Sequence, residues 1–227
     1  MPRKPRFFVP GFPVHAVQRG HDRGPVFFCD FDYLEYLRCL RNVARETGCA
    51  VHAYALMTNH VHLLLTPEST DSVGRLFQGI GRHYVRYINT TYRRHGALWE
   101  GRYKCNLVES QRYLLACMRY IEMNPVRAGM TDTPAEYRWT SYAGNALGSD
   151  NHVITPHDEY SALGRTATER QRAYRQLFNQ SGGDDDSSRF RAALQTGTPL
   201  GNDRFRTEIE SQLGRKVGFS RRGRPRR

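Results

Sequence analysis

Hydrophobic spacing between residues 12 and 124 alternates between two patterns in a fixed order. Segments in which every second residue is apolar predict strands, and segments in which apolar residues recur every three or four positions predict helices. The predicted elements are strand 12–19, helix 30–47, strand 50–57, strand 60–66, helix 71–94, strand 102–108 and helix 110–124. This β-α-β-β-α-β order, followed by a further helix, predicts an α+β fold of the ferredoxin-like type, an antiparallel sheet with helices on one face.

Residues with turn and capping chemistry separate these segments. Asp30 or Asp32 is the expected N-cap of the first helix, and Gly48 follows its expected end. Thr58-Asn59 lies between two predicted strands and indicates a hairpin. Pro125 predicts the end of the last helix, because the residue before a proline disfavours the helical conformation.

The rest of the chain shows weaker patterns. Residues 146–213 predict a mostly helical region, with an acidic loop at 181–188 (SGGDDDSS) that we expect to be solvated and not to bind metal. We therefore divide the chain into a basic N-terminal tail (1–6), a main domain (7–145), this helical region and a basic tail (214–227).

The positive charge is concentrated at the two ends of the chain. The net charge is +12, and subtracting the three cations of residues 1–6 and the seven of residues 215–227 leaves +2 for the body. Basic tails typically bind a polyanion, most often nucleic acid, although they can also be solubilising ends. Arg222-Gly223-Arg224-Pro225 matches the core of an AT-hook, which lies in a narrow minor groove, and plain phosphate binding is the alternative.

Composition excludes several classes of protein. No segment approaches the ~20 apolar residues needed to span a bilayer. Phe7-Phe8-Val9, followed by Pro10, is too short for the apolar region of a signal peptide. The five cysteines include no CxxC pair, which argues for reduced thiols and against a disulfide framework or thiolate zinc site. We therefore expect a cytoplasmic, nucleoid-associated protein with no membrane partner.

Two histidines stand two positions apart in the predicted strand 60–66. Because side chains alternate along a strand, His60 and His62 project from the same face of the sheet. Two imidazoles on one face can chelate a cation. Two half-buried structural histidines would give the same pattern.

A tyrosine and an asparagine are one turn apart at the end of the predicted helix 110–124. Tyr120 and Asn124 can therefore reach a common point. Taken singly, Tyr120 also fits an aromatic residue at the edge of the core, and Asn124 fits a helix-ending residue before proline.

Three segments together resemble a known family. They are MTNHVHLLL (57–65), LWEGRYK (98–104) and RYIEMNPVRAGM (119–130). They resemble the single-tyrosine HUH transposases, and more narrowly the REP-associated tyrosine transposases, over residues 7–145. The resemblance implies that this segment is an HUH-type catalytic domain. It implies metal-binding roles for His60 and His62, a nucleophilic role for Tyr120, and a role as third ligand for Asn124, where many relatives have Gln.

These residue types suit attack on a DNA phosphodiester. A phenol with a reference pKa of about 10 is a weak nucleophile at pH 7, and a divalent cation on the phosphate would offset the developing charge. The amide oxygen favours Mg²⁺ or Mn²⁺, although two imidazoles would also tolerate softer metals. A covalent phosphotyrosine would let a DNA hydroxyl rejoin strands without ATP, and the sequence has no GxxxxGK[ST] loop.

The expected partner is single-stranded or hairpin DNA, such as a REP-like palindrome. The residues expected to hold phosphates near the site are Arg102, Lys104, Arg112, Arg119 and Arg127. Trp99 could stack on unpaired bases, although a core position is an equal alternative. The sequence leaves open whether the chain acts as a monomer or a homodimer.

Two other functions remain open at this stage. A non-catalytic regulator on the same fold could bind structured DNA or RNA, and substitution of Tyr120 by Phe would then change little. A metal-dependent nuclease that uses water as its nucleophile would form no covalent protein–DNA adduct.

Overall fold

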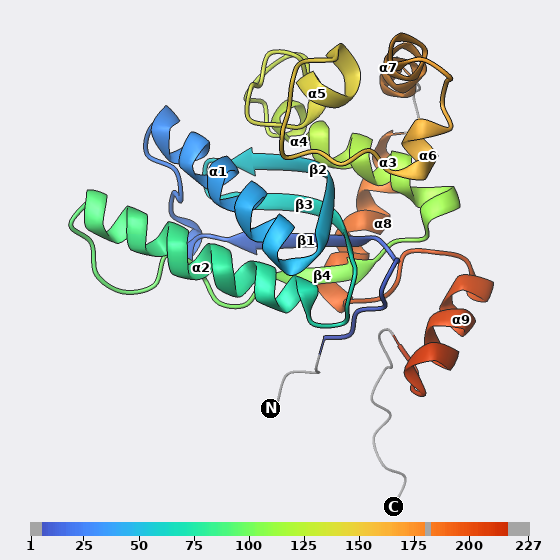
Figure 1. The fold of residues 1–227 in the computed structure, drawn as a ribbon, viewed down its shortest axis with the longest axis horizontal. Helices are drawn as coiled ribbons and strands as arrows, with labels where there is room; N and C mark the ends of the chain where they lie inside the picture. The colour runs from blue at the N-terminus through green and yellow to red at the C-terminus, as the bar shows by residue number, and fades with distance from the viewer. Residues whose placement is uncertain (1–5, 180–182, 218–227) are drawn as a thin grey trace, which may run out of the picture.

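A four-stranded antiparallel sheet forms the centre of the molecule (Figure 1). The computed structural model describes residues 6–179 and 183–217. The strands are β1 (Val14–Arg19), β2 (Cys49–Met57), β3 (His60–Pro67) and β4 (Lys104–Leu107). Their order is β2-β3-β1-β4, and every neighbouring pair is antiparallel. The predicted ferredoxin-like arrangement is confirmed.

Two long helices cover one face of the sheet, as expected. They are α1 (Asp30–Thr47) and α2 (Ser72–Thr91). Strand alternation directs Ala16, Leu63 and Leu65 into the core beneath them. The two helices approach closely at Gly79, where an added Cβ would lie 2.5 Å from a Val43 methyl group. A side chain at that position would therefore push α1 and α2 apart.

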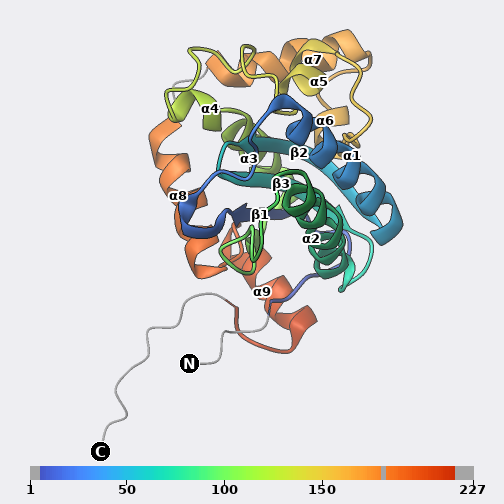
Figure 2. The ribbon, with the colours of Figure 1, turned by 90° about the vertical axis from the view of Figure 1, so that its left-hand side faces the viewer.

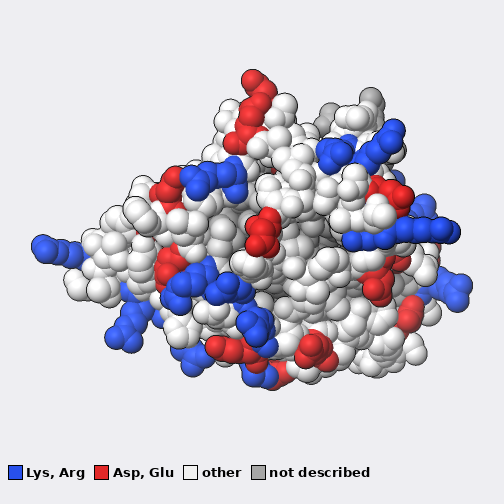
Figure 3. All heavy atoms as spheres, turned by 45° about the horizontal axis from the view of Figure 1, so that its top comes forward, with Lys and Arg blue, Asp and Glu red and all other residues white. Residues whose placement is uncertain are grey.

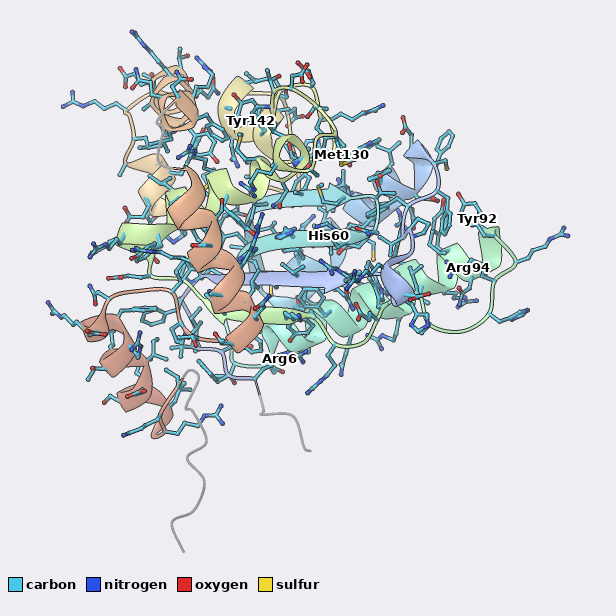
Figure 4. All side chains as sticks on the ribbon, turned by 180° about the vertical axis from the view of Figure 1, so that it is seen from behind. Arg6, His60, Tyr92, Arg94, Met130 and Tyr142 are labelled. Atoms are coloured by element: carbon cyan, nitrogen blue, oxygen red, sulfur yellow. The ribbon has the colours of Figure 1, made fainter. Side chains whose placement is uncertain are left out.

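Two other helices cover the opposite face. They are α3 (Ser110–Glu122), which packs on β2 and β3, and α8 (Gly183–Thr196), which packs on β4 and β1. Figure 4 shows α8 crossing the strands on this side of the sheet. Leu64, Leu114 and Ile121 belong to a second apolar cluster between these layers. The side chains of this face are therefore enclosed between the sheet and helices from distant parts of the chain.

The remaining elements are shorter helices. They are η1 (His21–Arg23), α4 (Asn124–Arg127), α5 (Tyr142–Leu147), α6 (Asp158–Ser161), α7 (Ala167–Gln176), η2 (Leu177–Asn179) and α9 (Asp203–Leu213). Figures 1 and 2 place α5, α6 and α7 together beyond the β2 edge, and α9 on the opposite side of the sheet, beyond β4.

A buried carboxylate joins these outer helices to α3. Glu122 is fully buried, and its two oxygens accept hydrogen bonds from Ser141 Oγ (2.5 Å), Asn145 Nδ2 (2.8 Å) and Tyr174 Oη (2.8 Å). Desolvation raises its pKa to about 7, while the three hydrogen bonds act in the opposite direction. Residues from α3, α5 and α7 and the segment before α5 therefore form one buried polar network.

The structure corrects several predicted boundaries. The expected division after residue 145 falls inside α5, so it does not separate two units. The expected acidic loop at 181–188 is wrong for residues 183–188, which form the first turns of α8, and residues 181 and 182 lie outside the described residues. The helix over 110–124 ends at Glu122, and Pro125 lies in the first turn of α4, where its missing N–H is tolerated.

The start of α1 is capped differently from the expectation. Its N-cap is Cys29, not Asp30 or Asp32. Asp32, two residues into the helix, accepts hydrogen bonds from the backbone N–H groups of Phe28 (2.7 Å) and Cys29 (3.1 Å). At the other end, Gly48 adopts the left-handed conformation (φ 64°) that ends the helix, as expected.

Candidate active site

The His-x-His pair of β3 faces α3 and α8. Since side chains alternate along the strand, His60, His62 and Leu64 share this face, whereas Leu63 enters the core beneath α1 and α2. On the neighbouring strand β1, Arg19 is opposite His60 and Val17 is opposite His62. The predicted shared face of the two histidines is therefore present, and β1 supplies its neighbours.

His60 is held in one tautomer by the residue before it. Its Nδ1 lies 2.7 Å from Asn59 Oδ1, and Asn59 Nδ2 donates to the carbonyl of Arg23 (2.9 Å). An amide oxygen only accepts, so His60 Nδ1 carries the proton and Nε2 keeps its lone pair. Burial, with a smaller effect from Arg19, lowers the pKa of His60 to about 4. His60 is thus neutral at pH 7, as a metal ligand must be.

His62 is buried more deeply, with 5% of its surface exposed. Its Nδ1 lies 3.0 Å from Nε2 of His15 on β1. Burial, and then the neighbouring imidazoles and arginines, hold the pKa of His62 well below its usual value. The second histidine of the pair is therefore also neutral at pH 7.

Tyr120 on α3 lies beside this pair. Its ring centroid is 6.1 Å from that of His62 and 5.7 Å from that of His15. The guanidinium of Arg127 lies 4.2 Å from the centroid of the Tyr120 ring and donates a hydrogen bond to the Tyr120 carbonyl. The rings of His62 and Tyr120, about sixty positions apart in the sequence, are thus neighbours in the fold.

A phenylalanine from α8 covers the tyrosine. The ring of Phe190 stacks on that of Tyr120 with centroids 4.7 Å apart, and only 6% of Tyr120 is exposed. Phe190 itself is buried against the sheet face that carries His15. In this conformation Tyr120 is therefore shielded from a macromolecular substrate.

Asn124, at the start of α4, has a fixed amide orientation. Its Nδ2 donates to the carbonyls of Tyr120 (3.2 Å) and Ile121 (3.0 Å). The Oδ1 atom has no hydrogen-bond partner within residues 6–179 and 183–217. The amide therefore keeps its oxygen, the atom that binds cations, available.

The donor set of these residues fits a divalent cation. In the described part of the chain, no three His, Cys, Asp or Glu side chains are grouped so that they could hold an ion. A cation bound by His60 and His62 would need a further ligand of another type, and the expected one is the Asn124 oxygen. In His60 and Asn124 the other polar atom of the side chain is already bonded to the protein, which leaves the ligating atom unpaired. Such a mixed nitrogen and oxygen set is compatible with Mg²⁺ or Mn²⁺.

Basic side chains line a cavity of about 560 Å³ beside the histidine face. The expected phosphate-binding residues Arg102 and Lys104 both line it. Three further cations line the same cavity, and the sequence analysis did not single them out: Arg6, Arg19 and Arg23. Arg19 is opposite His60, and Lys104 is opposite Val17 on β1, so the cavity adjoins the pair.

On the face in Figure 3, basic and acidic side chains lie near one another. Among the described residues that line the 560 Å³ cavity, Glu100 is the one acidic residue. The charge beside the histidines therefore differs from that of the face in Figure 3.

The other expected DNA-binding residues are placed unequally. The guanidinium of Arg127 lies over the Tyr120 ring. Arg119, which directly precedes Tyr120 in the chain, is half-buried. Arg112 is exposed in the first turn of α3, about 12 Å along the helix from Tyr120. Its guanidinium lies near the Tyr113 ring instead (5.8 Å), so the fold does not bring it to the site.

The expected DNA contact of Trp99 does not fit its position, and the expected DNA contacts of two arginines stay predictions. Trp99 is 8% exposed and packs in the core near Tyr36 and Tyr84, so the expected stacking of its ring on DNA bases is wrong for this conformation. Arg222 and Arg224 of the AT-hook-like segment lie outside the described residues.

Two residues of the site were missed by the sequence analysis. His15 could have been found, because it alternates with Val17 and Arg19 on the predicted first strand. Phe190 gave no such signal, because its contact with Tyr120 joins two helices 70 residues apart.

The chain combines a ferredoxin-like sheet with two neutral histidines beside a tyrosine on a helix. This combination is the one expected for the class of single-tyrosine HUH transposases. The sequence model of the IS200-like transposases matches residues 9–124, just over half of the chain. The chain belongs to this family.

A solved structure has the same fold, and a second is reported beside it. The structure of the REP-associated tyrosine transposase bound to a REP hairpin is similar, with a TM-score of 0.57 and 15% identity, over 69% of this chain and 93% of that chain. A Deinococcus radiodurans protein assigned as a transposase has 24% identity and a TM-score of 0.38, over 52% of this chain and 92% of that one. No curated protein matches the chain. Within the described residues, no helix is both long enough and apolar enough to cross a bilayer.

Proposed function

We propose that this transposase cleaves and rejoins single-stranded DNA through a covalent bond to Tyr120. The observation that carries the proposal is the position of the Tyr120 ring, 6.1 Å from the ring of His62 on the face that also bears His60. A phenol beside two neutral imidazoles is suited to nucleophilic attack on a phosphate.

The chemistry conserves the phosphodiester. The Tyr120 hydroxyl gives up its proton and its oxygen forms a bond to phosphorus as the bond to one deoxyribose oxygen breaks. That oxygen takes up a proton and leaves as a hydroxyl, so the number of protons is unchanged. The phosphotyrosine bond is then open to attack by another DNA hydroxyl, which releases Tyr120 and joins the strands. The exchange requires no ATP.

His60, His62 and Asn124 would hold a divalent cation, Mg²⁺ or Mn²⁺. When bound, the cation would draw charge from a phosphate oxygen and offset the charge that develops during attack. The protein's part is to keep both imidazoles neutral by burial and to turn the Asn124 oxygen away from the backbone carbonyls that its nitrogen binds.

The basic cavity beside the pair is the proposed path of the DNA strand. Arg19, Arg102 and Lys104 can contact successive phosphates there, which positions a strand without reading its bases. A REP hairpin is bound by the structural neighbour, and we infer that a REP-like palindrome, single-stranded or folded, is the substrate of this chain. The basic tails would add salt-dependent affinity.

A denaturing gel tests the proposal directly. The full chain is incubated with labelled single-stranded hairpin DNA and Mn²⁺, and a covalent protein–DNA band is expected. Tyr120→Phe should abolish that band and leave DNA binding intact. Tyr113→Phe, on the same helix but without a contact to the histidines, is the matched control and should retain the band. A band of equal intensity with Tyr120→Phe would reject the proposal.

A second candidate function is favoured by the burial of Tyr120. With 6% of its surface exposed, Tyr120 would be inert in a protein that only binds structured nucleic acid. Such a regulator would bind the hairpin with Mn²⁺ present and yield no covalent band. The same gel therefore separates the two functions, and a cleaved strand without adduct would indicate water as the nucleophile.

A further inference from the structure

A third histidine contacts the candidate metal site. His15 lies on β1 between β3 and β4, with none of its surface exposed. Its Nε2 lies 3.0 Å from Nδ1 of His62, and the two rings are 5.3 Å apart with 22° between their planes. The rings of Tyr120 and Phe190 enclose it from α3 and α8.

The bond between two neutral imidazoles allows two proton arrangements. Either His15 donates from Nε2, which leaves the proton of His62 on its own Nε2, or His62 donates from Nδ1 and keeps a lone pair on Nε2. Only the second arrangement leaves His62 a free nitrogen for a cation, because its Nδ1 is occupied in both.

The neighbouring histidine already shows the second arrangement. The Asn59 oxygen accepts from Nδ1 of His60 and leaves Nε2 unprotonated. His15 contacts Nδ1 of His62, the same ring atom that Asn59 contacts in His60. Partners that accept from the second ring nitrogen of a ligating histidine fix both its tautomer and its ring orientation.

We propose that His15 is a positioning residue: it accepts a hydrogen bond from Nδ1 of His62 and so presents Nε2 of His62 to the cation. This inference rests on the proposed function. In this arrangement the proton of His15 sits on Nδ1, a buried atom without a hydrogen-bond partner in the described residues. An unpaired buried donor is destabilising and is retained where it serves a site.

The proton positions can be observed in the metal-free full chain. Long-range ¹H–¹⁵N correlation spectra with ¹⁵N-histidine distinguish protonated from bare ring nitrogens, and His62→Gln and His15→Gln assign the signals. We expect His62 with a protonated Nδ1 and a bare Nε2. A proton on Nε2 of His62 would overturn the inference. Absence of a covalent Tyr120–DNA band on the denaturing gel would reject the proposed function, but it would leave the inferred role of His15 unchanged.

Mn²⁺ affinity gives a second readout that is independent of DNA cleavage. His15→Phe keeps a ring but removes the acceptor, and we expect Mn²⁺ to bind about 10–100-fold more weakly, as is usual when a ligand loses its hydrogen-bond partner. His15→Gln supplies an amide oxygen at similar reach and should restore most of the affinity. Wild-type affinity in His15→Phe would contradict the inference.

A control separates this effect from lost stability. His52 on β2 is a buried histidine outside the site, bonded to the Thr155 carbonyl (2.7 Å) and Thr66 Oγ1 (2.8 Å). His52→Phe should destabilise the protein and leave Mn²⁺ affinity unchanged. If it weakened Mn²⁺ binding as much as His15→Phe does, the effect would be one of stability and the inference would fail. If His15→Phe does not fold, the spectra of the wild type and His15→Gln still decide.

Discussion

The rings of Tyr120 and Phe190 are stacked, with 27° between their planes and 4.7 Å between their centroids. The contact joins α3, within the part of the chain that matches the family, to α8, which lies beyond it. In-line attack on a phosphate requires the phenol oxygen to reach a strand. A substrate therefore has to enter past α8 or displace it, and this contact relates the C-terminal helices to the proposed chemistry.

Truncation of the covering ring should expose the tyrosine. We expect Phe190→Ala to destabilise the fold by about 3–5 kcal/mol, as is usual for a buried phenylalanine, and to increase the initial rate of adduct formation per folded molecule. Denaturant unfolding and the denaturing gel measure the two effects. Phe178→Ala, which removes a ring packed on Tyr142 and Tyr174, is the control and should destabilise without faster adduct formation. An unchanged rate in Phe190→Ala would show that the stacking does not limit access.

Loss of the buried carboxylate should detach the outer helices from α3. In Glu122→Ala the hydroxyls of Ser141 and Tyr174 and the amide of Asn145 lose their acceptor, and each unpaired buried group is destabilising by about 1–3 kcal/mol. We expect a loss of at least about 2 kcal/mol in the free energy of unfolding, measured by urea denaturation. Glu136→Ala, which removes an exposed carboxylate that caps a turn, should lose much less. Equal losses would indicate that the network adds little to stability.

The strands of the sheet could be predicted because a strand has a local sequence pattern, the alternation of side chains between its two faces. Alternation along residues 60–66 was sufficient to place His60 and His62 on one face, and the observed β3 differs by one residue at its end. The pairing of β1 with β3 then brings His15 to His62, a contact that depends on strand order, and strand order is a property of the whole sheet.

Other features depended on tertiary context that a local pattern does not contain. Trp99 sits in a basic, aromatic segment that suggested DNA contact, yet its ring fills the core between α1 and α2. The segment 181–188 suggested a loop by composition, but residues 183–188 begin α8. Acidic residues are compatible with solvated loops and also with the N-terminal ends of helices. The same residue types fit both states, and packing of α8 on β1 and β4 decides between them.

Acid should destabilise the protein through its buried histidines, and His52 isolates one contribution. Burial lowers the pKa of His52 to about 4, from an ordinary value near 6.5. Below pH 6.5 the unfolded chain therefore binds a proton that the folded state excludes, so stability falls as the pH drops from 6.5 towards 4. The contribution of His52 amounts to about 3 kcal/mol over this window. In His52→Gln the slope of unfolding free energy against pH should be shallower, as measured by urea denaturation at several pH values. A slope identical to that of the wild type would show that His52 titrates normally.

The cations of the cavity should determine how steeply salt weakens DNA binding. Each phosphate contact releases condensed counterions, and its loss reduces the slope of log affinity against log salt by about 1. We therefore expect the double variant Arg102→Gln and Lys104→Gln to reduce that slope by about 2, with fluorescence anisotropy of a labelled single-stranded hairpin as the measurement. The matched control is Arg38→Gln with Arg41→Gln on α1, which covers the other face of the sheet and is outside the cavity. If both double variants changed the slope equally, net charge would account for binding and the strand would have no defined path beside His60.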